Sequence, residues 1–88
     1  MTKADLKAWM QEQRKEALAH GRIKFHVMIA STYRSLVGIL DLCEDVAQFE
    51  EALIEIQGHA AACLREDFSV SGFTSNLVYQ DVSKYLNR

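Results

Sequence analysis

The chain has 88 residues, of which 49% are hydrophobic and 25% charged, and its formal net charge is −2. This balance is ordinary for a globular protein and argues against a disordered chain. A chain of this length forms one domain, residues 1–88, and the lack of proline beside only four glycines favours helices. Residues 1–15 lack the apolar run of a signal peptide, and Lys24, Arg34 and Asp41 interrupt the longest apolar stretch. We therefore expect no contact with a membrane, and a cytoplasmic location.

The first predicted helix covers residues 3–20. Thr2 followed three residues later by Asp5 resembles a capping box at its start, and Gly21 after His20 is a common stop signal. Leu6, Trp9 and Met10 give this helix an apolar edge, whereas residues 11–16 are polar. We expect a surface helix that is anchored at its first half.

The second predicted helix covers residues 23–42, where apolar residues recur at spacings of three and four: Phe25, Ile29, Tyr33, Leu36, Leu40 and Cys43. Such spacing places side chains on one face of an α-helix. Residues 22–30 also alternate as a β-strand would. The helical interpretation is preferred because its spacing continues well beyond Ile29.

The third predicted helix covers residues 45–66, with a second apolar stripe formed by Val46, Phe49, Leu53, Ile56, Ala60 and Cys63. Asp45 with Gln48, or Asp41 with Glu44, could cap its start. A single bent helix through both stripes is the alternative, and it would require an obligate dimer. Residues 68–73 are expected to connect to a fourth helix, 75–87, capped by Thr74 or Ser75. The predicted fold is all-α, a small bundle of about four helices built on a central antiparallel hairpin.

The sequence offers little support for catalysis or for a bound metal. Cys43 and Cys63 fall on the apolar stripes, far apart in a hairpin, so we expect two buried, reduced thiols. His59 and Cys63 have the spacing of metal ligands, and His26 could lie opposite them, but a chance pair of this kind is common. There is no nucleophile elbow, phosphate loop or zinc-protease motif. We expect no enzyme activity, no cofactor and no metal.

The charges are distributed unevenly along the chain, with bases concentrated in residues 1–34 and six acids without a base in residues 41–55. The acidic side of the third helix predicts a small regulatory, adaptor or inhibitor protein that binds a protein partner, either a basic protein or a second copy of the chain. The predicted contact residues are Glu44, Gln48, Glu51 and Glu55, with Trp9 and Met10 as a second choice. The alternative is a nucleic-acid-binding module that uses the basic first helix, through Lys7, Arg14, Lys15 and Arg22.

Overall fold

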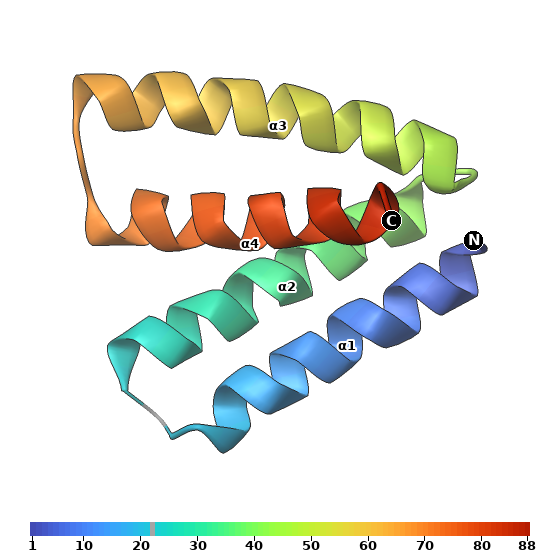
Figure 1. Ribbon diagram of the computed structural model, residues 1–88, viewed down its shortest axis with the longest axis horizontal. Helices are drawn as coiled ribbons and strands as arrows, with labels where there is room; N and C mark the ends of the chain where they lie inside the picture. The colour runs from blue at the N-terminus through green and yellow to red at the C-terminus, as the bar shows by residue number, and fades with distance from the viewer. Residues whose placement is uncertain (22) are drawn as a thin grey trace.

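The computed structural model describes residues 1–21 and 23–88. Within them it contains four helices and no strand: α1 (Lys3–Ala19), α2 (Lys24–Leu42), α3 (Val46–Glu66) and α4 (Val70–Leu86). The all-α prediction is confirmed. Successive helices run in opposite directions, so the α1–α2 and α3–α4 connections lie at one end of the bundle (Figure 1). The α2–α3 turn and both chain termini lie at the other end (Figure 1).

The start of α1 is fixed by the predicted capping box. The Asp5 backbone N–H donates to Thr2 Oγ1 at 3.1 Å, and the Thr2 N–H donates to the Asp5 carboxylate at 3.2 Å. These bonds favour the ionised carboxylate and hold the pKa of Asp5 below its usual value. The helix ends at Ala19, and Gly21 follows with a φ of 116°, a left-handed conformation that a side chain would disfavour.

The central region consists of two helices rather than one long one. Residues from Lys24 onward are helical, which decides against the strand interpretation for the described part of that segment. The chain then breaks at residues 43–45, where Asp45 Oδ1 accepts a bond of 2.8 Å from the Gln48 N–H. In return, Gln48 Oε1 accepts from the Glu44 N–H. These two side-chain bonds fix the start of α3 without a glycine or proline in the turn.

The fourth helix begins earlier than the sequence suggests, at Val70 instead of residue 75. Ser69 caps it by accepting a bond of 3.0 Å from the Gly72 N–H, so only a short segment separates α3 from α4. Thr74 therefore lies inside the helix, fully buried, and its hydroxyl donates to the Val70 carbonyl. The serines and glycine of this segment have weak helix propensity, which is why the sequence favours a connector there.

The hydrophobic core draws on all four helices instead of on the central pair alone. α1 packs closely on α2, and α3 packs on α4, whereas α2 and α3 make few contacts with each other. α4 also contacts α2 and thereby joins the two hairpins. The central core consists of side chains that are almost completely buried: Leu6, Met10, Tyr33, Leu36, Leu40, Phe49, Leu53, Val78 and Val82. α1 and α4 therefore bury part of the apolar stripes of α2 and α3.

Two glycines lie inside helices without a packing reason. A Cβ atom built on Gly38 of α2 or on Gly58 of α3 would meet nothing within 4 Å. Each glycine makes its helix less stable than alanine would, so Gly38→Ala and Gly58→Ala are each expected to raise the free energy of unfolding by about 0.5–1 kcal/mol. Urea denaturation followed by circular dichroism measures the change.

Gly72 is the matched control for this prediction. It is also helical, but its Cβ would lie 3.0 Å from Ser69 Oγ and 3.1 Å from Leu64 Cδ1. Crowding of this kind offsets the gain in helix propensity. Gly72→Ala should therefore give little or no stabilisation, and an equal gain at all three positions would contradict the packing described for α3 and α4.

Candidate functional site

The acidic face of α3 is formed by Glu44, Gln48, Glu51 and Glu55, the residues that the sequence predicts as contacts, and all four are exposed. The Gln48 side chain is already engaged in the cap of α3, so it serves the fold as well as the surface. Among the described residues the structure contains one ion pair, between Lys7 and Asp41. The carboxylates of Glu44, Glu51 and Glu55 thus have no basic partner within this described part of the chain. Their negative charge is available to a basic group of another molecule.

An exposed apolar side chain lies at the edge of this acidic face. Ile54 is 65% exposed, and it is positioned three residues after Glu51, directly before Glu55 and four residues before Gly58. Spacings of three and four bring Glu51, Ile54 and Gly58 to the same side of the helix. Gly58 adds a place without a side chain, where an approaching surface can come close to the backbone. Ile54 is not among the contact residues predicted from the sequence, although its position outside the apolar stripe of the third helix is a visible signal.

The residues of the second predicted contact, Trp9 and Met10, pack inside the bundle. Met10 is fully buried in the core. The Trp9 ring stacks on Tyr85 of α4, with 4.0 Å between ring centroids, and meets the edge of Tyr33 of α2 at 6.1 Å. Burial raises the pKa of Tyr33 to about 12, with a smaller contribution from the charge of Asp81. These aromatic residues hold α1 against the bundle and do not offer a contact surface.

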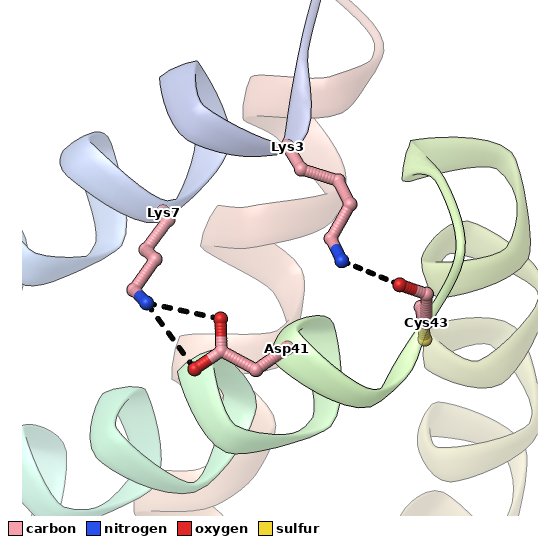
Figure 2. Close-up of polar contacts among 4 residues, drawn as sticks. All are labelled: Lys3, Lys7, Asp41 and Cys43. Carbon is pink, nitrogen blue, oxygen red and sulfur yellow. Dashed lines mark hydrogen bonds and ion pairs between the residues drawn. The ribbon is translucent and has the colours of Figure 1, made fainter.

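Of the described basic residues proposed for the nucleic-acid alternative, Lys7 is already paired within the chain. Figure 2 shows that Lys7 Nζ pairs with both carboxylate oxygens of Asp41, at 3.0 and 3.2 Å. In the same view, Lys3 Nζ donates to the Cys43 carbonyl (Figure 2). These two lysines tie α1 to the end of α2. Arg14 and Lys15 are exposed, but neighbouring positions point in different directions on a helix. Arg22 lies outside the described residues.

A shallow groove between α1 and α2 brings together two arginines that the sequence separates. Arg14 and Arg34 line it together with Leu18, Val27, Ala30 and Ser31, and its volume is about 240 Å³. Only Arg14 of this pair was proposed from the sequence. Arg34 lies on a different helix, and its proximity to Arg14 depends on how α1 packs on α2. Two guanidinium groups on one groove suit an anionic ligand.

The histidines and cysteines are dispersed. Cys43 is half-buried, and Cys63 is exposed, so the expectation of two buried thiols is wrong for Cys63. Cys63 Sγ lies 3.6 Å from His59 Nε2, whereas the ring of His26 is beside that of His20, with centroids 5.6 Å apart. Over residues 1–21 and 23–88, no group of three or more His, Cys, Asp or Glu side chains is placed to hold a metal ion.

None of the helices, over the residues described, has the length and apolar character needed to cross a membrane. Comparisons with family models, with characterised proteins and with solved structures find no match to this chain. The candidate function must therefore be argued from the surface itself.

Proposed function

We propose that this chain is a small, non-enzymatic binding protein of the regulatory, adaptor or inhibitor type, which acts in the cytoplasm by docking the acidic face of α3 on a protein partner. The observation that carries the proposal is Ile54, an apolar side chain that is 65% exposed between Glu51 and Glu55. A large exposed aliphatic side chain beside carboxylates suits a protein interface, in which an apolar contact is bordered by polar groups.

The partner that fits this face has an apolar depression bordered by lysine or arginine. Ile54 would fill the depression, and Glu51 and Glu55 would pair with the surrounding bases. Basic surfaces of this kind commonly bind phosphate groups. By occupying one, the chain would act as an inhibitor of a nucleic-acid-binding or other phosphate-binding protein.

Affinity capture with charge-reversal variants tests the proposal. The tagged chain is incubated with host lysate, with and without nuclease, and captured proteins are identified by mass spectrometry. We expect a stoichiometric protein that remains after nuclease treatment, and its capture should fall at least about tenfold with the double variant Glu51→Lys, Glu55→Lys, since opposed charges become like charges. Ile54→Asp should reduce capture similarly, because it removes the apolar part of the contact.

The matched control is the double variant Glu12→Lys, Glu16→Lys, which changes the net charge equally at two exposed positions of α1. It should leave capture unchanged. Equal loss with both double variants, or no stoichiometric protein in any capture, would overturn the proposal. Material that disappears with nuclease and with Arg14→Glu, Arg34→Glu would instead support the nucleic-acid alternative, through the groove between α1 and α2.

A further inference from the structure

The exposed apolar side chains concentrate at one end of the bundle. Seven of the ten large hydrophobic side chains that are exposed in the described residues lie at or next to the α1–α2 and α3–α4 connections: Leu18, Ile23, Phe25, Val27, Phe68, Val70 and Phe73. Both connections lie at the same end (Figure 1). Ile23 is 61% exposed and Phe68 is 66% exposed. Scattered single apolar residues are normal on a surface, but a concentration at one end indicates a contact surface.

A cavity of about 370 Å³ opens at this end between α3 and α4. Its apolar lining includes Leu64, Phe73 and Leu77, and Phe68 stands at its edge with its ring centroid 5.9 Å from that of Phe73. Arg65 contributes to the same lining. A space of this size accepts one or two large side chains from outside.

The charges at this end are arranged so that one copy complements another. The α3–α4 connection carries Glu66 and Asp67 beside Phe68, and all three are exposed. Lys24, also exposed, lies beside Ile23 and Phe25 at the start of α2. The same end therefore has an apolar corner with two acids beside Arg65 and an apolar corner with a base. A two-fold axis lying in the contact plane would place the acidic corner of each copy opposite the basic corner of the other.

The total accessible surface of the chain is larger than average for its mass. The chain exposes 5804 Å², whereas a typical monomer of 10.0 kDa exposes about 5,200 Å². The surplus, about 600 Å², shows that the chain is less compact than an average protein of its mass.

We infer that the chain forms a two-fold symmetric homodimer through this end of the bundle, in which Ile23 and Phe25 of each copy cover the cavity beside Phe68 of the other. Glu66 and Asp67 pair with Lys24 across the interface, twice per dimer. This surface does not overlap the acidic face of α3, so the dimer is independent of the proposed function and presents two such faces to partners.

Sedimentation equilibrium of complementary charge variants tests the dimer. The wild type should be dimeric, and the variants Lys24→Glu and Glu66→Lys, Asp67→Lys should each lose at least about tenfold in dimer affinity, because symmetry turns both pairings into repulsion. An equimolar mixture of the two variants should restore the dimer, because both pairings in the mixed dimer are then attractive, one with the wild-type charges and one with the charges exchanged. Circular dichroism checks that each variant folds. All these positions are exposed.

Three results would overturn the inference. The first is a wild type that is monomeric at every concentration up to the order of 100 μM, where even a small interface is measurable. The second is a dimer that neither charge variant weakens, which would place the interface elsewhere. The third is a mixture of the two variants that stays monomeric, which would contradict the two-fold arrangement.

Phe68→Ser, which removes the exposed ring without changing charge, should also weaken the dimer, and an unchanged affinity would again contradict the interface.

Discussion

Replacing Phe49 with alanine is expected to lower the free energy of unfolding by about 3–5 kcal/mol. Phe49 is fully buried and lies in the first turn of α3, where it packs in the core shared by all four helices. Its removal loses the free energy of burying the ring and leaves a cavity that the neighbouring helices can only partly fill. Small domains are stable by about 5–15 kcal/mol in total, so the variant should be partly unfolded at moderate temperature.

Urea denaturation followed by circular dichroism measures this loss, and Ile54→Ala is the matched control. It removes an aliphatic side chain from the same helix, but one that is mostly exposed, so its effect should stay within about 0.5 kcal/mol. If Phe49→Ala cost less than about 1 kcal/mol, or if both variants cost the same, the inner and outer faces assigned to α3 would be incorrect.

The second large effect is expected at Trp9. Its ring stacks on Tyr85 with an angle of 3° between the planes and meets Tyr33 edge-on at 79°, so it joins α1 to both α4 and α2. Trp9→Ala should lower the free energy of unfolding by about 2–4 kcal/mol. This loss is somewhat smaller than for a completely buried ring, because Trp9 is half-buried. Amide hydrogen exchange should also become faster near Tyr85, in the last turns of α4.

Trp9→Phe is the informative companion to this variant. A smaller aromatic ring can keep part of the stacking on Tyr85, so its cost should be clearly lower than that of alanine. Denaturant unfolding gives both values, and hydrogen exchange locates the change along the chain. Equal costs for alanine and phenylalanine, with exchange in α4 unaffected, would show that the aromatic stack does not hold α1 and α4 together.

Local signals in the sequence predict much of this fold. The Thr2–Asp5 and Asp45–Gln48 caps and the two apolar stripes involve residues only a few positions apart, and the structure confirms the helices that they mark. The start of α4 was misplaced because Ser69 and Gly72 are typical of loops as well as of helix starts.

The surface was harder to predict because it depends on which helices meet. Whether Trp9 is buried depends on Tyr33 and Tyr85, which lie far away in the sequence. The pairing of Lys7 with Asp41 likewise joins α1 to the end of α2. The acidic residues of α3 were found from their spacing alone, whereas the importance of Ile54 emerges only once its neighbours are known to leave it exposed.

The central claim, that α3 is the docking surface, is tested most directly by an NMR titration of the isotope-labelled chain with the captured protein. We expect the amide signals of residues 44–58 to shift or broaden, with the largest changes around Glu51, Ile54 and Glu55. Changes confined to α1 and the groove beside Arg14 and Arg34, or to the end of the bundle around Phe68, with α3 unaffected, would contradict the claim.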